Sequence, residues 1–204
     1  MNDVSPGNPC PFLRALVSQG LLPDGGASLG EVTQTIRRVA ATGDGSPDLP
    51  AVAIRAIALI ANGLGPFSLA RNATSGVRLN ELRNGPLDKK GAGSGILDSQ
   101  ARVVDAELKR LATFASNKTD ASGRTELGLS LDELTTMMDA NFERAAGRRR
   151  AVDRRLMDGE WPVLLKVLGK EGPNGRYLAV ADVNTLIKER RLPARMAGPL
   201  KKGA

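Results

Sequence analysis

Residues 9–25 read PCPFLRALVSQGLLPDG, and this stretch sets our expectation for the fold. Proline is favourable at the first position of a helix, so we expect a helix to begin at Pro11 with Cys10 at its N-cap. The apolar run after it ends at Gly20 and at the turn over 23–25. The chain therefore opens with a short helix that carries a cysteine at its positive end.

Short apolar segments separated by glycine-rich turns continue along the chain. Two capping boxes, Ser28 to Glu31 and Ser130 to Glu133, each predict the start of a further helix. Residues 51–61 are apolar nearly all round, so we expect them to form the central buried helix.

The remaining segments complete the predicted architecture. We expect an irregular loop over 63–95, a helix over about 98–114, a polar loop over 117–128 and a helix near 182–188. No long run alternates apolar and polar residues as a half-buried strand does. The sequence therefore predicts one all-α, multi-helix domain over 1–204, with its core at about 8–196 and a basic tail at 197–204.

Composition narrows the chemistry that the chain can perform. The 204 residues include one cysteine and no histidine. Without histidine there is no Ser-His-Asp triad, no Cys-His dyad and no histidine-ligated zinc or haem. A lone cysteine excludes an internal disulfide and a cysteine-cluster metal site. On one interpretation Cys10 is an inert buried thiol. On the other, the helix N-terminus stabilises its thiolate, which is a nucleophile and a ligand for haem iron.

The charge balance favours anionic partners. Lys and Arg number 29 against 22 Asp and Glu, for a formal net charge of +7, which suits nucleic acid, phosphates, acidic lipid or a carboxylated cofactor. Aromatic residues are only 3% of the chain, which argues against a surface that stacks nucleic-acid bases.

No apolar stretch approaches the roughly 20 residues of a membrane span, and the N-terminus lacks the features of a signal peptide. We therefore expect no membrane contact and a cytoplasmic protein, or a secreted one if a leader was removed.

Several short motifs succeed one another in a set order along the chain. Pro9-Cys10-Pro11, an apolar helix and the turn at 20–25 come first. The later motifs are Leu79-Asn80-Glu81-Leu82, Gly95 to Ala101, Gly159-Glu160 and Arg190-Arg191-Leu192-Pro193. This order resembles the haem-thiolate peroxidases, the family of chloroperoxidase and the unspecific peroxygenases, over about residues 8–196. The resemblance is most specific at the two ends, and it implies that family's all-α fold with a long irregular loop and a haem b cofactor.

The resemblance assigns the cofactor side of the site to Cys10 and its neighbours. It makes Cys10 the proximal ligand of the haem iron, with Pro9 and Pro11 flanking it in the cofactor site. Asp98 falls in the segment that, in the family, binds magnesium beside a haem propionate. Here a glutamine and Arg102 occupy the other positions of that segment. Magnesium needs carboxylates and other oxygen ligands, so we expect no magnesium and a direct pairing of Arg102 with a propionate.

The resemblance also indicates the acid–base groups. Ser99 falls where some members carry a catalytic histidine, and it could hold a water. Glu160 falls in the distal segment, where a carboxylate can move a proton between the two oxygens of a peroxide. Taken by itself, Glu160 is equally well a first-turn helix residue that the helix dipole favours. The function implied is the oxidation or oxygenation of a small organic substrate by hydrogen peroxide.

A different class of function stays open. The pI is near 10.0, and arginines cluster at Arg148, Arg149, Arg150, Arg154 and Arg155. On this alternative the chain is a non-enzymatic basic helical protein that retains the fold and binds nucleic acid or an acidic partner. The plainer interpretation of the cluster is a solvated helix face.

One short loop has a weak metal-binding signal. Asp120 to Gly123 resembles the start of a calcium-binding loop, but the acidic residue that should close such a loop is missing.

Overall fold

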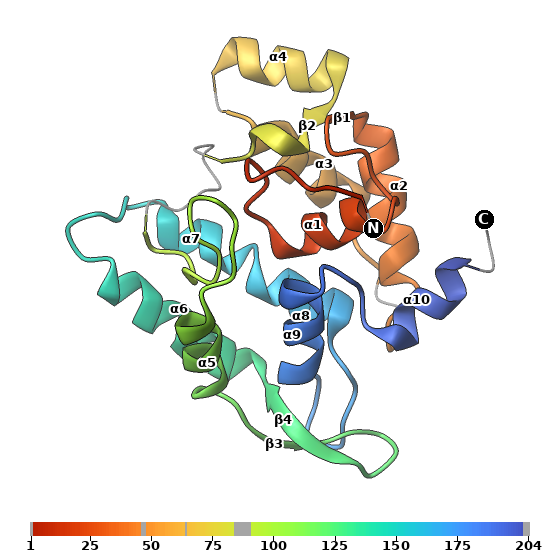
Figure 1. The fold of residues 1–204 in the computed structure, drawn as a ribbon, viewed down its shortest axis with the longest axis vertical. Helices are drawn as coiled ribbons and strands as arrows, with labels where there is room; N and C mark the ends of the chain where they lie inside the picture. The colour runs from red at the N-terminus through yellow and green to blue at the C-terminus, as the bar shows by residue number, and fades with distance from the viewer. Residues whose placement is uncertain (1, 46–47, 64, 84–90, 202–204) are drawn as a thin grey trace.

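The computed structural model describes residues 2–45, 48–63, 65–83 and 91–201 (Figure 1). The helices are α1 (Pro11–Ser18), α2 (Leu29–Ala40), α3 (Ala51–Ala61), α4 (Pro66–Ser75), α5 (Asp105–Ala112), α6 (Leu131–Arg144), α7 (Asp153–Asp158), α8 (Trp161–Leu168), α9 (Val180–Lys188) and α10 (Ala194–Lys201). The strands are β1 (Gly26–Ala27), β2 (Val77–Arg78), β3 (Ser116–Thr119), β4 (Thr125–Leu129) and β5 (Leu178–Ala179), and a 3-10 turn spans Leu79–Glu81.

The prediction of an all-α fold is wrong, because two antiparallel sheets accompany the helices. One joins β1 to β2, and the other has the order β3-β4-β5. The residues expected to form a polar loop at 117–128 instead build the β3–β4 hairpin. Their composition hid this, because the strands SNKT and TELGL are largely exposed and carry few of the β-branched or aromatic residues that mark a strand.

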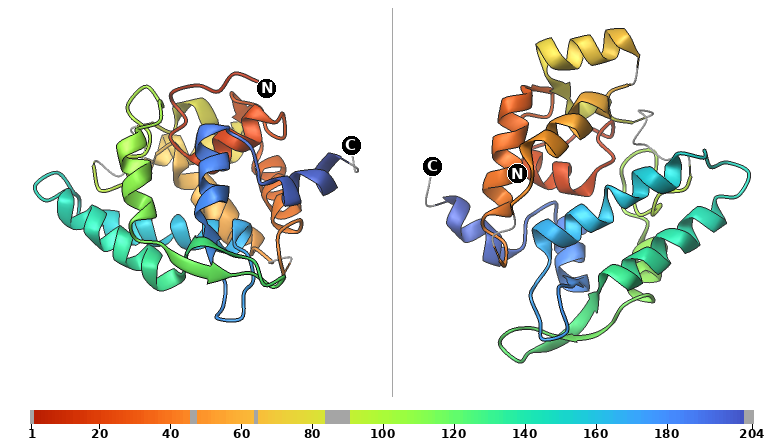
Figure 2. Two further views of the ribbon diagram at one scale, coloured as in Figure 1. Left: turned by 60° about the horizontal axis from the view of Figure 1, so that its bottom comes forward. Right: turned by 180° about the vertical axis from the view of Figure 1, so that it is seen from behind.

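The first part of the chain packs around α1. This helix begins at Pro11 with Cys10 at its N-cap, as the sequence predicts. Its buried side, with Ala15 and Leu16 fully buried, joins the main core. Helix α1 contacts α9, so the two ends of the chain meet there. The right view in Figure 2 shows α2, α3 and α4 on the same side of the molecule as α1, with α4 at its edge.

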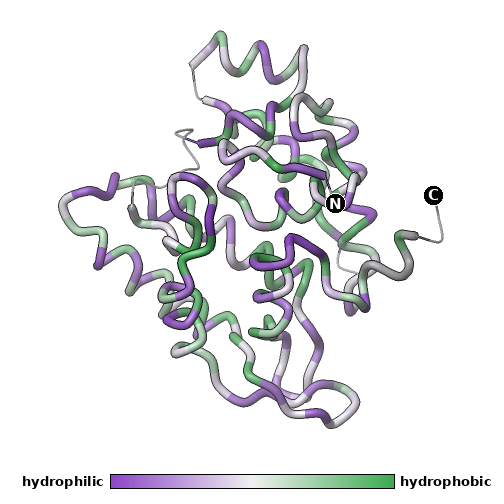
Figure 3. The backbone as a smooth tube through the Cα atoms, viewed as in Figure 1, coloured by the Kyte–Doolittle hydropathy of each residue, from purple (hydrophilic) through white to green (hydrophobic). Residues whose placement is uncertain are grey.

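Helix α3 is not the central buried helix that its composition suggested. It contacts α2 and α4, and it buries Ile54, Ala58 and Ala61. Val52 is 79% exposed and Ile57 is 40% exposed. Helices α8 and α9 lie nearer the middle of the molecule (Figure 1), where hydrophobic residues alternate with hydrophilic ones (Figure 3), and both helices bury several apolar side chains.

Two other boundaries differ from the expectation. The segment 63–95, expected to be irregular, contains α4, β2 and the 3-10 turn, while residues 84–90 lie outside the described part of the chain. The helix expected from about Asp98 begins at Asp105 instead. A turn closed by the Leu97–Val103 bridge occupies the difference, with Ala101 in the left-handed region at a φ of 55°. The Asp98 side chain stabilises that turn by accepting the backbone N–H groups of Gln100 and Arg102.

The second part of the chain is a pair of helix–strand–helix units. One unit is α5–β3–β4–α6 and the other is α8–β5–α9; we call them the helix–strand pair. Strands β4 and β5 join them through Gly128 opposite Ala179 and Leu129 opposite Leu178. A Cβ on Gly128 would lie 2.3 Å from a ring carbon of Tyr177, so this junction requires glycine. The capping box of Ser130 and Glu133 starts α6 as predicted.

No helix in the described part of the chain combines the length and the apolar character needed to cross a bilayer.

Candidate functional site

Cys10 lies at the N-terminus of α1 with its side chain half-buried. Its backbone is extended, and its carbonyl accepts the first helical hydrogen bond from the Arg14 N–H at 3.0 Å. Pro11 comes next and needs no hydrogen-bond partner for its nitrogen. The unpaired amides and the dipole of the helix direct positive potential toward the Cys10 side of α1, where a negative charge is favoured.

Asn8 supplies a buried hydrogen-bond donor beside Cys10. The side chain is completely buried, and its Oδ1 accepts the backbone N–H of Cys10 at 3.2 Å. This bond fixes the orientation of the amide group, because only the oxygen can accept a proton from Cys10. Nδ2 then has no hydrogen-bond partner among the described atoms. An unsatisfied buried donor costs about 1–3 kcal/mol, so Asn8 Nδ2 is available to an acceptor.

Arg14 holds the segment that carries Asn8 and Cys10. Its Nη1 donates to the carbonyl of Ser5 at 2.9 Å and to the carbonyl of Asn8 at 3.1 Å. The N–H of Ser5 donates in turn to both carboxylate oxygens of Asp24 at 3.2 Å. Residues 5–10 are therefore fixed to α1 by an arginine and to the turn after α1 by an aspartate.

Positive charge exceeds negative charge around this segment. Burial lowers the pKa of the Arg14 guanidinium, and repulsion by Arg190 and Arg83 lowers it further, while Asp24 and the Cys10 thiol act in the opposite direction. The net effect on Arg14 is unfavourable to its charge, because burial and the two arginines outweigh Asp24 and Cys10.

Motifs far apart in the sequence meet at this site. The Arg83 N–H donates to the carbonyl of Gly7 at 2.7 Å, and Arg83 Nη2 donates to the carbonyl of Asp98 at 3.1 Å. At the C-terminal end of α9, the Leu192 N–H donates to the side-chain oxygen of Gln19 at 2.9 Å. The structure therefore brings the Cys10 segment together with parts of the middle and closing motifs.

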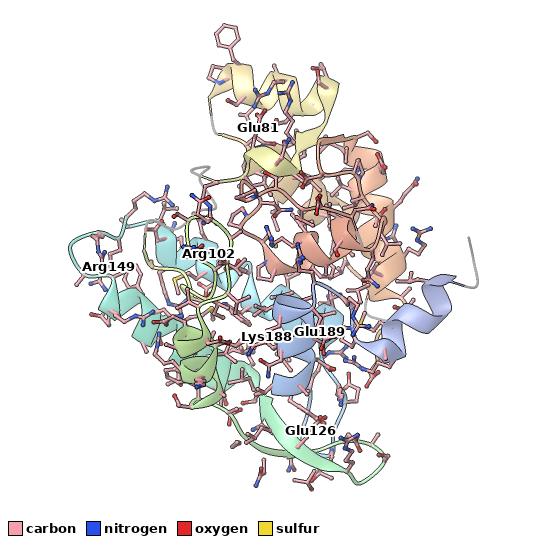
Figure 4. All side chains as sticks on the ribbon, in the orientation of Figure 1. Glu81, Arg102, Glu126, Arg149, Lys188 and Glu189 are labelled. Carbon is pink, nitrogen blue, oxygen red and sulfur yellow. The ribbon has the colours of Figure 1, made fainter. Side chains whose placement is uncertain are left out.

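Asp98, Ser99 and Arg102 form a turn of their own at the surface. Asp98 Oδ2 accepts from Arg102 Nε at 2.8 Å. The hydrogen bonds from the Arg102 backbone and side chain lower the pKa of Asp98. Ser99 is exposed, and the Arg102 side chain is 77% exposed (Figure 4). In this state Arg102 is paired with Asp98, so the pairing of Arg102 with a propionate stays a prediction.

Glu160 lies at the junction of α7 and α8 and is half-buried. Its N–H donates to Met157 at 3.1 Å, and its carbonyl accepts from Leu164 at 3.0 Å. Glu160 therefore occupies the N-cap of α8, close to the helix N-terminal position that the helix dipole favours for a carboxylate. Its role as an acid–base group stays a prediction.

Two small cavities lie in the described part of the structure. The first, lined by Ile96, Arg110 and Met137 among others, has no room for a water molecule. The second has about 100 Å³ and lies between the β3–β4 hairpin and the loop before β5. Neither is lined by Cys10, Asp98, Ser99, Arg102 or Glu160. Sites for organic ligands span roughly 300–1,000 Å³, so a large ligand at Cys10 requires the packing beside α1 to open.

The arginine cluster after α6 is largely paired within the chain. Arg149 Nη1 donates to Glu143 at 3.0 Å, and the guanidinium lies 4.0 Å from the centre of the Phe142 ring (Figure 4). Arg150 pairs with the buried Asp153 at 2.6 Å, while Arg154 pairs with Asp139 and Asp158. These pairs reduce the positive charge that the cluster offers to phosphates.

Acidic residues of the helix–strand pair also have cationic partners. Lys170 Nζ lies 2.5 Å from Glu126 Oε1, and Tyr177 donates its hydroxyl to the same oxygen at 2.9 Å. Figure 4 shows Glu126 near the β3–β4 hairpin. The other pairs are Lys118 with Glu133, Arg176 with Glu171 and Arg195 with Asp182. No group of three potential metal ligands occurs within the described ranges.

Comparison of the sequence with protein-family models finds no match, and comparison with curated proteins finds no significant match.

Two residues of this site escaped the sequence analysis. Arg14 stands alone as a charge within the apolar run of α1 and lies one helical turn after Cys10, a signal that could have marked it as a partner of the Cys10 segment. Asn8 gives no comparable signal, because its importance depends on burial.

Proposed function

We propose that the protein is a haem-thiolate enzyme that uses hydrogen peroxide to oxidise or oxygenate a small organic substrate. The observation that carries this proposal is the site at the N-terminus of α1. There, a half-buried cysteine lies beside a completely buried amide donor without an acceptor. The order of the motifs along the chain supports the same assignment.

The residues around Cys10 fit the role of a thiolate ligand to haem iron. Cys10 would bind the iron as a thiolate, and Pro9 and Pro11 would restrict its backbone. The buried Nδ2 of Asn8 and the surplus cations beside Arg14 suit the negative charge of a thiolate or a propionate. When bound, a haem with a thiolate ligand supplies heterolytic cleavage of the peroxide O–O bond.

The substrate side requires a rearrangement. Arg102 would have to leave Asp98 to reach a propionate, and the packing beside α1 would have to open. Glu160 is proposed to move the proton between peroxide oxygens, and Ser99 to hold a water. We propose no magnesium, because Arg102 already occupies the Asp98 carboxylate.

The test is the absorption spectrum of the protein after addition of haem, reduced under carbon monoxide. We expect a strongly red-shifted Soret band in the wild type that is lost in Cys10→Ser. Peroxide-dependent oxidation should then fall in Glu160→Gln, with Glu31→Gln, at an exposed position of α2, as the matched control. A spectrum that is the same in the wild type and Cys10→Ser would rule out thiolate ligation.

The same experiment separates the alternative function. A protein that binds no haem but binds DNA in a strongly salt-dependent way would be the basic helical binding protein instead. The internal pairing of Arg149, Arg150 and Arg154 makes this the weaker proposal.

A further inference from the structure

Helix α3 carries apolar side chains on the face that points away from the rest of the chain. It buries Ile54, Ala58 and Ala61, which share one side of the helix because successive residues turn by about 100°. Val52 and Ala56 fall on the opposite side, and both are exposed. The outward face of a surface helix normally carries polar residues, so α3 has the composition of a buried helix with one side uncovered.

Helix α4 extends this apolar surface beyond α3. The two helices contact each other, and Figure 1 and the right view of Figure 2 place α4 at the outer edge of the molecule. Every residue of α4 is described, and only Asn72 among them is buried. Phe67 is 91% exposed, and Ala70, about one turn later, is exposed as well. Since most of the stability of a helix in a protein comes from packing its apolar face, contact with a partner would stabilise α4.

We propose that this α3–α4 surface, formed by Val52, Ala53, Ala56, Phe67 and Ala70, binds the surface of an anionic lipid bilayer. Phe67 would enter the boundary between the headgroups and the acyl chains. The expectation of no membrane contact rested on the lack of a membrane-spanning stretch, and helices that lie in the interface do not need one. This inference does not depend on the proposed haem function.

The charge of the segment selects an anionic surface. Residues 49–80 contain Arg55, Arg71 and Arg78 but no aspartate or glutamate. Glu81 pairs with Arg71 and Arg78, whereas Arg55 is exposed and has no ion pair with the described acidic residues. Arg55 lies three residues after Val52, at the border of the apolar face. An unpaired cation beside an exposed apolar helix face is typical of helices that bind anionic lipid.

Two other occupants fit this surface less well. A second copy of the chain would bring the same arginines together, in a protein whose formal net charge is already +7, and like charges repel. A protein partner would need a preformed pocket for the protruding Phe67 side chain. A fluid bilayer accepts such a side chain without a pocket, and it supplies the opposite charge.

The experiment measures the partition of the full chain between buffer and lipid vesicles by flotation. The probe vesicles contain phosphatidylglycerol mixed with phosphatidylcholine, and vesicles of phosphatidylcholine alone are the reference. We expect binding to the anionic vesicles to be at least about tenfold stronger than to the reference. Binding should weaken as salt rises, because salt screens the charges. A chain that stays in the buffer with anionic vesicles at low salt would overturn the proposal.

Two substitutions separate insertion from simple attraction of charge. Phe67→Ser leaves the charge unchanged, and we expect it to lower the partition onto anionic vesicles at least about tenfold. Leu131→Ser, at a 50% exposed position of α6, is the matched control and should leave partition unaltered. Equal partition of wild type and Phe67→Ser would show that net charge alone adsorbs the protein, and it would refute the proposal.

Arg55→Gln tests the cation at the border of the apolar face. We expect about a fivefold loss of partition onto anionic vesicles, the effect of one cation near an anionic surface. Arg124→Gln removes the same charge from the exposed loop between β3 and β4 and should have a much smaller effect. Equal losses in the two variants would contradict binding by the α3–α4 surface.

Two further measurements locate the contact and test the other occupants. On addition of anionic vesicles, the tryptophan emission of Phe67→Trp should shift to shorter wavelength, and that of Leu131→Trp should not. Trp161, the single native tryptophan, is buried and gives both variants the same background. Sedimentation velocity without lipid tests self-association. A dimer that Phe67→Ser dissociates would assign the surface to a second copy and overturn the proposal, as would a monomer that ignores the vesicles.

Discussion

Residues 5–10, which form the Cys10 segment, and the helix–strand pair differ in how their polar groups find partners. In the helix–strand pair, Glu126, Glu133, Glu171 and Asp182 each have a lysine or arginine of the same chain as partner. Beside Cys10, the repulsion of Arg190 and Arg83 lowers the pKa of Arg14, and the buried Asn8 amide keeps a donor without an acceptor among the described atoms. The first arrangement pairs its carboxylates within the chain, whereas the second leaves a buried donor unpaired.

This difference distinguishes a structural region, the helix–strand pair, from a region that can bind a ligand, the segment around Cys10. Buried polar groups in proteins almost always find partners, and an exception in a folded chain needs a reason. In the helix–strand pair each of these carboxylates has a cationic partner, although Asp182 Oδ2 forms only an ion pair and lacks a hydrogen bond. Among the unsatisfied buried groups, the one at Asn8 lies within two residues of the chain's only cysteine, and we propose that the chemistry belongs to that place.

The largest expected effect comes from breaking the apolar junction of the helix–strand pair. Leu129 is completely buried where β4 meets β5. We expect Leu129→Ala to lower the free energy of unfolding by about 3 kcal/mol through lost burial and the cavity left behind. Urea denaturation measures this loss. Leu127 in the same strand is 48% exposed, and Leu127→Ala should cost less than about 1 kcal/mol. Equal losses would show that β4 faces the core differently.

A smaller loss of stability is expected from removing Lys170, which forms an ion pair with Glu126 within the helix–strand pair. The side chains of Lys170 and Glu126 are 17% and 13% exposed. Removing one partner of such a pair leaves a poorly solvated charge, so we expect Lys170→Met to cost about 2 kcal/mol. Lys166→Met, on an exposed position of α8, is the matched control and should cost little. If both substitutions have the same effect on urea denaturation, Lys170 does not stabilise the helix–strand pair.

We expect acid to lower the stability of the helix–strand pair, because Glu133 becomes protonated. Burial raises the pKa of Glu133, but hydrogen bonds from Ser116, Ser130 and Lys118 outweigh it and lower the pKa from 4.5 to about 2. A depressed carboxylate contributes stability that is complete above the unfolded pKa and is lost as pH falls. The contribution should therefore disappear between about pH 4.5 and 2. Allowing for solvent screening, we expect about 1 kcal/mol.

The measurement for Glu133 is the free energy of unfolding as a function of pH. The curve of Glu133→Gln should lie below that of the wild type at neutral pH and approach it near pH 2, because glutamine does not titrate. Two curves separated by a constant amount across this range would contradict the proposed role of the carboxylate.

The sequence predicts the helices better than the strands, for physical reasons. The helix at Pro11 and the capping box at Ser130 result from local chemistry, and both are confirmed. Strands β3 and β4 depend on pairing with each other and with β5, which no local pattern in SNKT or TELGL reveals. The apolar composition of α3 predicted burial that the neighbouring helices do not provide, and Val52 stays exposed.

The candidate site also contains features that local sequence predicts and features that only the tertiary structure reveals. The position of Cys10 at a helix N-terminus is set by the proline beside it. The pairing of Asp98 with Arg102 has no such local signal, because the sequence suggests a helix there and a turn forms instead. The unsatisfied amide of Asn8 depends on burial from several segments, so only the structure reveals it.

The smallest expected change in stability is also the one that most sharply tests the missing acceptor. Asn8 and Asn72 are both completely buried, and each has one side-chain atom without a partner among the described atoms. In Asn72 that atom is the acceptor Oδ1, while Nδ2 donates to the carbonyl of Leu59 at 2.7 Å. In Asn8 it is the donor Nδ2. Asn72→Asp loses a bond and places a carboxylate against a carbonyl, so we expect a cost of about 2 kcal/mol.

Asn8→Asp should change the free energy of unfolding by less than about 0.5 kcal/mol. It removes only an unsatisfied donor, and it places a negative charge near Arg14 and the N-terminus of α1, where such a charge is favourable. Urea denaturation of both variants gives the comparison. If Asn8→Asp costs as much as Asn72→Asp, the Asn8 donor already has a partner within the folded chain. The site at Cys10 would then be complete without a ligand, as the helix–strand pair is.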